Sequence, residues 1–196
     1  MAKAKPVARL SALASTAHNA RLMARARLSD MYEWSEFVDK PYCVHELHNL
    51  RIAAKRLRYT LEIFADALPP FSADAIEVLT RIQDELGVLH DSDVLIALLR
   101  LCLGSYDAGY NDALRNMKLR QGKGRFQVPP DLVAVLLDPA ARPSADERYG
   151  LERLLQEQQV TREIQYAAFR QYWYALQARD FRRQLLNALD TSGTID

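Results

Sequence analysis

Residues 48–59 read HNLRIAAKRLRY and place one histidine and four cations within twelve positions. The whole chain carries 26 Lys and Arg against 25 Asp and Glu, a formal net charge of only +1. At about 100° per residue, the apolar positions in and around this stretch gather on one side of a helix. They predict a core face made of Leu47, Leu50, Ala53, Ala54, Leu57, Leu61 and Phe64.

A row of charged side chains lies beside this predicted core face. The row holds His48, Arg51, Lys55, Arg58 and Glu62, and the apolar residues Ile52, Tyr59 and Ile63 border it on the other side. Arg56 and Asn49 fall on what reads as the outer face. The three cations repel one another, and Glu62 can neutralise only one of them. A solvated cationic edge is one reading, but the two apolar borders favour a groove that holds phosphates, which arginine binds in pairs and lysine as a point charge.

The other long periodic segments also read as helices, and no stretch alternates as a strand does. We expect helices at about 7–38, 44–68, 74–103 and 146–189, bounded by Pro41, by Pro69-Pro70 and by Gly104. Residues 104–145, rich in Gly and Pro, form an irregular insertion that could hold short helices around 107–119 and 130–137. The fold class we predict for residues 1–196 is all-α, a single domain built as an antiparallel four-helix bundle.

The first of these helices carries a heptad stripe, which is typical of bundle packing. The stripe consists of Leu10, Ala14, Ala17, Arg21, Ala24, Leu28, Met31 and Ser35. Arg21 occupies a stripe position and Arg25 lies one turn further on. An arginine in such a place needs an anionic partner or a wet interior, so both are weaker candidates for an anion site.

Charge is spread unevenly along the chain. Residues 1–70 hold eleven Lys and Arg against seven Asp and Glu, and residues 71–115 hold three against eight. Residues 116–127 add Lys118, Arg120, Lys123 and Arg125 without an anion, which makes these four possible loop contacts for a polyanion.

Several features point to a cytoplasmic protein. The N-terminal residues MAKAKPVARL lack an apolar signal region, and no run of about eighteen apolar residues is present to span a membrane. Cys43 and Cys102 have no CxxC spacing and read as buried free thiols.

Two motifs resemble those of a known family. His48-x-x-Arg51-x-x-x-Lys55-Arg56-Leu57-Arg58 is similar to the fingerprint of the CHAD domain, the conserved histidine α-helical domain. Gln83-Asp84-x-Leu86-Gly87-x-Leu89-His90-Asp91-x-Asp93-Val94 resembles the segment that follows it in that family, and the aromatic last helix with Phe169, Trp173 and Leu176 is compatible.

The resemblance implies a helical protein with a basic channel that binds inorganic polyphosphate and catalyses no reaction. His48, Arg51, Lys55 and Arg58 are its implied phosphate contacts, and neither a cofactor nor a metal is implied. Association with polyphosphate granules in the cytoplasm is an open extension of this reading.

This chain departs from the family in carrying one fingerprint, where the family typically has two repeats related by a pseudo-twofold axis. A single repeat would supply half of the channel wall. We therefore expect a homodimer in which a true twofold replaces the internal one, with a lone bundle and an open groove as the fallback.

Three other readings stay open. The HELH run at 45–48 has its histidines three apart and lacks a third placed ligand, so His45 reads as a surface residue more readily than as a zinc ligand. Gln83, His90 and Asp93 read as a polar interior strip that orients or neutralises the cations. The alternatives for function are a metal-dependent phosphohydrolase using His90, Asp91 and Asp93, and an adaptor for nucleic acid or protein, although the aromatic residues of the last helix read as core and not as a base-stacking surface.

Overall fold

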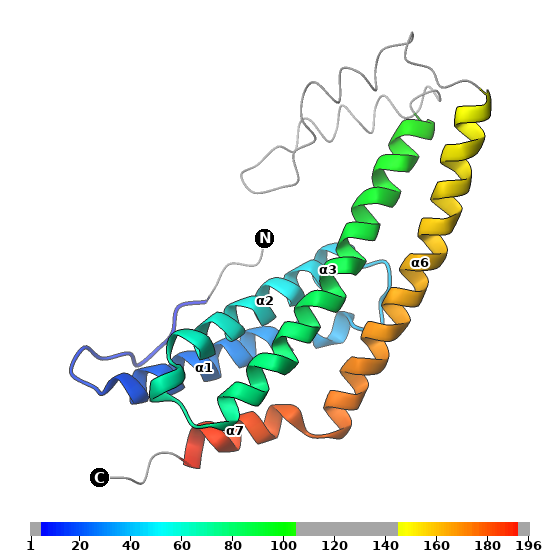
Figure 1. Cartoon of the computed structure of the whole chain (residues 1–196). Coiled ribbons are helices and arrows are strands. Elements are labelled where there is room, and N and C mark those ends of the chain that lie inside the picture. Colours follow the sequence, from blue (N-terminus) through cyan, green and yellow to red (C-terminus); the bar gives the residue numbers. More distant parts are fainter. Residues whose placement is uncertain (1–4, 105–144, 192–196) are drawn as a thin grey trace. The chain divides into compact units, whose positions relative to one another are not determined.

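The computed structural model describes residues 5–104 and 145–191 and shows an all-helical protein (Figure 1). Its elements are α1 (Thr16–Tyr32), η1 (Ser35–Phe37), α2 (Val44–Ile63), η2 (Ala65–Ala67), α3 (Phe71–Gly104), α6 (Ala145–Ala178) and α7 (Phe181–Thr191). These described ranges contain no strand. The all-α class predicted from the sequence is thus confirmed.

The chain divides into two compact units. The first, which we call the core unit, covers Ala2–His90 and Ile164–Asp196, and the second covers Asp91–Glu163. Helices α3 and α6 each contribute to both units. The short helices expected at 107–119 and 130–137, and the loop cations Lys118, Arg120, Lys123 and Arg125, lie outside the described residues.

The core unit is built around α1 and α2, which lie side by side and run in opposite directions (Figure 1). The predicted core face of α2 is correct for six of its seven members, because Leu47, Leu50, Ala53, Ala54, Leu57 and Leu61 are all buried. They join Leu28 and Met31 of α1 in one continuous cluster. Burial of this α2 face against α1 therefore fixes which side of α2 remains available to a ligand.

The first predicted helix is shorter than the heptad stripe suggests. Ser15 caps α1, because its hydroxyl accepts a hydrogen bond from the His18 backbone N–H at 3.2 Å. Before it, the Asn19 side chain donates to the Ser11 carbonyl at 2.8 Å and accepts from the Ser11 N–H, so these backbone groups are taken by a side chain. Leu10, the first stripe residue, is 47% exposed as a result.

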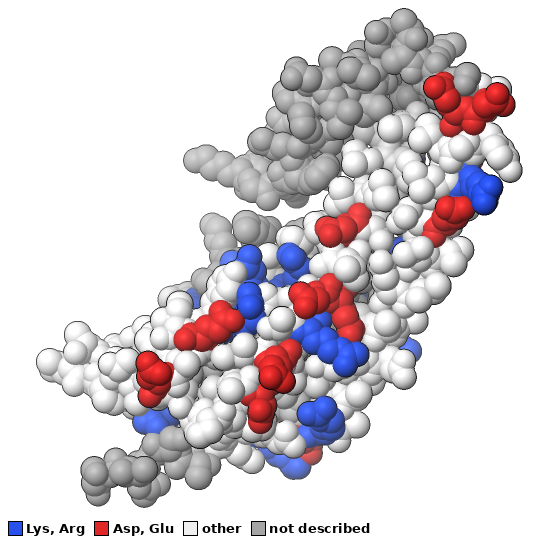
Figure 2. Space-filling model, in the orientation of Figure 1, with Lys and Arg blue, Asp and Glu red and all other residues white. Residues whose placement is uncertain are grey.

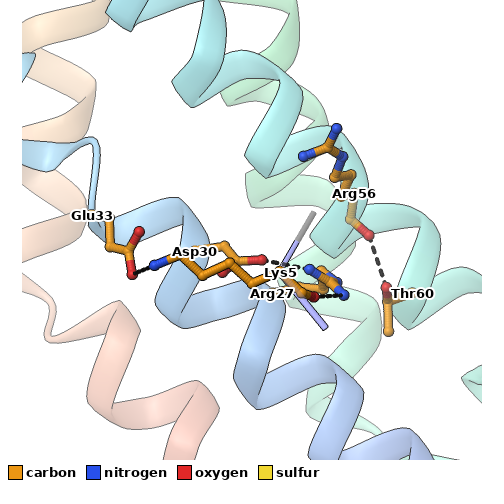
Figure 3. Close-up of polar contacts among 6 residues, drawn as sticks. All are labelled: Lys5, Arg27, Asp30, Glu33, Arg56 and Thr60. Carbon is orange, nitrogen blue, oxygen red and sulfur yellow. Dashed lines mark hydrogen bonds and ion pairs between the residues drawn. The ribbon is translucent and has the colours of Figure 1, made fainter. Parts of the chain in front are cut away.

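The segment before α1 is held along this helix by charge. Arg27 donates to the backbone carbonyl of Lys5 at 2.8 Å and pairs with Asp30 at 2.5 Å (Figure 3). The Lys5 ammonium pairs with Glu33 near the end of the same helix. Arg27 and Asp30 are thus structural charges and are unavailable to an anion.

The boundaries of the second and third predicted helices also move. Helix α2 ends at Ile63, and a turn of 3-10 helix at Ala65–Ala67 replaces its expected last residues. Helix α3 starts at Phe71 and not at Asp74, because the carbonyls of Pro69 and Pro70 accept from the N–H groups of Ser72 and Ala73. The start expected at about residue 74 therefore lies three residues too late.

The last predicted helix, 146–189, is broken at Arg179–Asp180. Asp180 adopts a left-handed backbone with φ 54, and its carbonyl then accepts from the Gln184 N–H at 2.9 Å to start α7. An unbroken helix would continue the buried series Phe169, Trp173 and Leu176 into polar residues. The break changes the phase, so that Phe181, Leu185 and Leu189 are buried instead.

Both cysteines are free, as predicted, but Cys43 and Cys102 are half-buried and not fully buried. Within residues 5–104 and 145–191, no helix is long and apolar enough to cross a membrane.

Candidate anion-binding site

The basic row of α2 lies at the surface of the core unit. His48, Arg51, Lys55 and Arg58 are all half-buried, while the apolar residues directly before them, Leu47, Leu50, Ala54 and Leu57, are buried. Lys and Arg atoms gather over α2 in the face shown in Figure 2. Because these side chains are half-buried, they have less freedom than fully exposed ones.

Arg51 is positioned by α3. Its Nε donates to the backbone carbonyl of Gln83 at 3.3 Å, and its guanidinium lies against Gly87, where an added Cβ would be 3.5 Å from Nε and 3.6 Å from Nη2. The space left by the missing Cβ of Gly87 is used by the Arg51 side chain. Gln83 is itself buried and donates to the Leu79 carbonyl at 3.0 Å.

Lys55 and Arg58 share the ring of Tyr59. The Lys55 ammonium lies 5.4 Å from the ring centroid and the Arg58 guanidinium carbon 4.8 Å from it, both within cation–π range. Arg58, with its side chain 23% exposed, also pairs with Glu62 at 3.1 Å, and its buried Nε has no hydrogen-bond partner. Glu62 thus neutralises Arg58, the single cation it can reach.

Arg51 and Lys55 differ from Arg58 in their lack of a counter-charge. Across the described residues, no carboxylate forms an ion pair with either of them. The two residues are four apart on α2, so their positive groups face the same side of the helix. Two adjacent cations without a carboxylate are the arrangement that an anionic ligand would complete.

His48 extends the row to a residue of α3. Its ring centroid is 4.7 Å from that of His90, with 44° between the ring planes, and the Nδ1 atom of each ring is buried without a hydrogen-bond partner. Burial lowers the pKa of His48, and the nearby His90 and Arg51 lower it further. The sequence placed His90 in the same interior as the row but did not predict this ring pair.

Comparison with known families finds one matching family model. The family model of the CHAD domain matches residues 2–100. The chain belongs to the CHAD domain family. No curated protein and no solved structure matches it. The matched residues of this CHAD domain include all of α1 and α2 and most of α3. Helices α6 and α7 lie beyond the match, and so do the aromatic residues that the sequence indicates are compatible with the family.

Of the two first-helix candidates, Arg25 has an ion pair within the core unit. Arg25 pairs with Asp190 of α7, and its Nε is buried without a hydrogen-bond partner. Arg21 is half-buried and has interactions of its own. In this CHAD domain, Arg25 therefore has a structural counter-charge, unlike Arg51 and Lys55.

Asp93 forms an ion pair with a cation of α6 and not with a member of the basic row. Its carboxylate accepts from Arg162 Nε at 2.7 Å, and the two side chains are only 12% and 6% exposed. Arg162 also lies 3.7 Å from Glu163, while Asp91 is exposed. The sequence could not reveal Arg162 as the partner, because nothing in its local pattern distinguishes it from other helix cations.

The described residues show no arrangement that would support the alternative metal sites at His45 or at His90, Asp91 and Asp93. Within the described ranges, no group of three or more His, Cys, Asp or Glu side chains is placed to hold a metal ion. His45 is exposed, with Nδ1 3.2 Å from the Asn49 amide nitrogen and 3.6 Å from Glu46.

The expectation that Asn49 lies on the outer face is wrong, since Asn49 is buried. Helix α2 contacts η1 as well as α1, so it has less open surface than a helix packed on one side.

Proposed function

We propose that this CHAD domain binds inorganic polyphosphate, or a similar polyanion, through a basic groove along α2 and does not catalyse its breakdown. The observation that carries the proposal is the pair Arg51 and Lys55, adjacent on one helix face and without a carboxylate partner among residues 5–104 and 145–191. Two half-buried cations without a carboxylate partner favour an anion with repeated charge. Membership in the CHAD family supports the same ligand class.

In this proposal each member of the row has a distinct role. The guanidinium of Arg51, oriented by the Gln83 carbonyl, binds phosphate oxygens through its remaining N–H groups. Lys55 supplies a point charge one turn away, and Arg58 exchanges Glu62 for a phosphate. His48 adds a fourth contact. Arg21 and Arg25 stay secondary candidates, because binding there would have to displace existing contacts.

The proposal extends to architecture and assembly. We propose that the long helices form one CHAD repeat arranged as an antiparallel four-helix bundle, that the protein works in the cytoplasm, and that two copies associate to complete the channel wall. Tyr59 is 43% exposed and Ile63 is 74% exposed, and with the half-buried Ile52 they supply an apolar stripe beside the basic row. A second copy covering this stripe would bring two basic rows to one ligand.

A polyphosphate titration of the double variant Arg51→Ala/Lys55→Ala tests the site. The matched control is Arg148→Ala/Arg153→Ala, which removes two cations, each in an i,i+4 pair on α6, for the same change in net charge. At low salt we expect the first variant to lose about tenfold or more in affinity and the control to lose little. The affinity of the wild type should also fall more steeply with salt than that of the site variant. The reason is that the variant, with two cations fewer, neutralises fewer phosphates of the ligand. Equal losses in the two variants would refute the assignment.

Two further measurements separate the rival functions. Duplex DNA or RNA, added at equal phosphate concentration, should fail to displace polyphosphate if recognition is selective. Release of orthophosphate from polyphosphate with added Mg²⁺ or Mn²⁺ would contradict a non-catalytic role and favour a phosphohydrolase that uses His90, Asp91 and Asp93.

A further inference from the structure

We propose that His48 and His90 act together as a proton-uptake pair at one end of the basic row, so that binding of a polyphosphate chain draws protons onto these imidazoles. This inference rests on the proposed function and adds to it a second helix, α3, as a source of ligand contacts. It also predicts that the affinity for polyphosphate rises as the solution becomes mildly acidic.

The geometry of the two rings carries the proposal. Their centroids are 4.7 Å apart, so two imidazolium charges there would repel strongly. The Nδ1 atom of each ring is buried and has no hydrogen-bond partner, so the other nitrogen, Nε2, is the atom that a ligand would meet. No hydrogen bond or ion pair to another described residue holds either ring in one protonation state.

The charges around His48 explain why a ligand would change its protonation. The groups that lower its pKa, after burial itself, include His90 on α3 and Arg51 and His45 on α2, and none of them is a carboxylate. Without an anion, this cationic surrounding disfavours the imidazolium. A phosphate chain that spans Arg51 and the two rings reverses the sign of the local field and favours protonation. By linkage, a ligand that favours the protonated form binds more tightly when protons are abundant.

Calorimetry with long-chain polyphosphate measures this linkage directly. Titrations near the usual pKa of histidine, about 6.5, in two buffers of different ionisation enthalpy, give the number of protons taken up on binding. Long chains are used because their interior phosphates stay ionised in this range. We expect net proton uptake by the wild type, and a gain in affinity of about threefold or more on going from about pH 7.5 to about pH 6.

Single variants assign the protons to the pair. His90→Gln should lower the number of protons taken up on binding and flatten the pH dependence of the affinity. The control, His18→Gln, changes an exposed histidine of α1 and should behave as the wild type does. Unchanged uptake in both His48→Gln and His90→Gln, with binding retained, would overturn the inference and leave the proposed function standing. A lack of binding at every pH would overturn both.

A measurement on the unaltered protein guards against variants that fold poorly. The ring signals of His48 and His90 can be followed by NMR during pH titrations with and without polyphosphate. We expect their titration midpoints to move to higher pH when polyphosphate is present. Midpoints that do not move in the bound protein would contradict the proposal, whatever the variants do.

Discussion

At the scale of single residues, what distinguishes the cations of this protein is the presence or absence of a counter-charge. Arg58 has Glu62, Arg25 has Asp190 and Arg162 has Asp93, and all of these are ion pairs within the folded chain. Arg51 and Lys55 have no such partner among the residues described. Since the sequence presents all of them as similar helix cations, this difference is a property of the fold.

Replacing Glu62 by glutamine tests whether this carboxylate competes with the ligand. The change removes the negative charge that pairs with Arg58 at 3.1 Å, which frees the guanidinium for phosphate. Because an i,i+4 pair stabilises a helix by about 0.2–0.5 kcal/mol, we expect polyphosphate affinity to rise by about twofold. Glu152→Gln, which frees Arg148 in an equivalent pair on α6, is the control for net charge. If both changes raise affinity equally, only the overall charge matters.

Substitutions of Gly87 test whether the position of the Arg51 side chain matters for binding. The nearest atom to an added Cβ is Arg51 Nε at 3.5 Å, which is ordinary van der Waals contact. Gly87→Ala should therefore fit, and it should raise the free energy of unfolding by about 0.5–1 kcal/mol because alanine favours helix. Gly87→Leu would fill the space that the guanidinium occupies and should weaken polyphosphate binding severalfold.

Thermal melts and binding titrations of the two Gly87 variants separate stability from site geometry. Weaker binding by the leucine variant, with binding by the alanine variant preserved, supports a ligand contact by Arg51. Full affinity in the leucine variant would show that the observed position of the guanidinium is unimportant.

His48 gives a prediction for the stability of the free protein. Its pKa is lower in the folded state than the usual value of about 6.5. On acidification, the unfolded chain binds the proton first, so this contribution to stability is complete above about pH 6.5 and is lost as the pH falls towards the folded pKa. The free energy of unfolding should thus fall less between pH 7 and pH 5 in His48→Gln than in the wild type. Urea unfolding at several pH values measures this, and identical slopes would contradict it.

At the scale of elements, the charge pair between α3 and α6 belongs to the second unit. Asp93 and Arg162 are nearly buried, and loss of one member leaves a buried charge. Removing one partner of a buried pair typically costs about 3–5 kcal/mol, and Glu163 at 3.7 Å should reduce the loss here to the lower end. We expect Asp93→Ala to destabilise the protein by about 3 kcal/mol, and Asp91→Ala, a change at an exposed site, to cost little.

Chemical unfolding of both variants, with and without Mg²⁺ or Mn²⁺, distinguishes a structural Asp93 from a metal ligand. A structural carboxylate predicts the loss of stability in Asp93→Ala and no effect of the metal on the wild type. Stabilisation of the wild type by the metal, abolished in Asp93→Ala, would restore the phosphohydrolase hypothesis.

The elements also show how far a sequence pattern can be followed. The core face of α2 was predictable, because buried residues at helical spacing stay on one side of an unbroken helix. The break before α7 was not, since neither Gly nor Pro marks it and Asp180 takes the left-handed conformation itself. The start of α1 at Thr16 was missed for a similar reason: Ser11 and Asn19 form local hydrogen bonds that no periodic pattern reveals.

At the scale of the whole molecule, the contacts of the candidate site join two helices, so the pattern of one helix cannot predict them. The row itself could be read from α2, because its members share a face of that helix. The partners of the row could not be read from α2. His90 lies 42 positions after His48, and Gln83 lies 32 positions after Arg51. Such contacts follow from packing of α3 against α2, and a helical wheel treats each helix alone.

The last prediction concerns assembly, because one row leaves most sides of a polyphosphate chain uncovered. If two copies meet along the stripe of Ile52, Tyr59 and Ile63, light scattering should give twice the mass of one chain, and Ile63→Glu should shift the protein to monomer. The same variant should weaken polyphosphate binding, because each monomer then offers half of the wall. Ile164→Glu is the matched control, since that isoleucine of α6 is 66% exposed and lies on another helix. A wild type that stays monomeric at high concentration without ligand counts against the dimer, and a monomer that keeps full affinity would favour a lone bundle with an open groove.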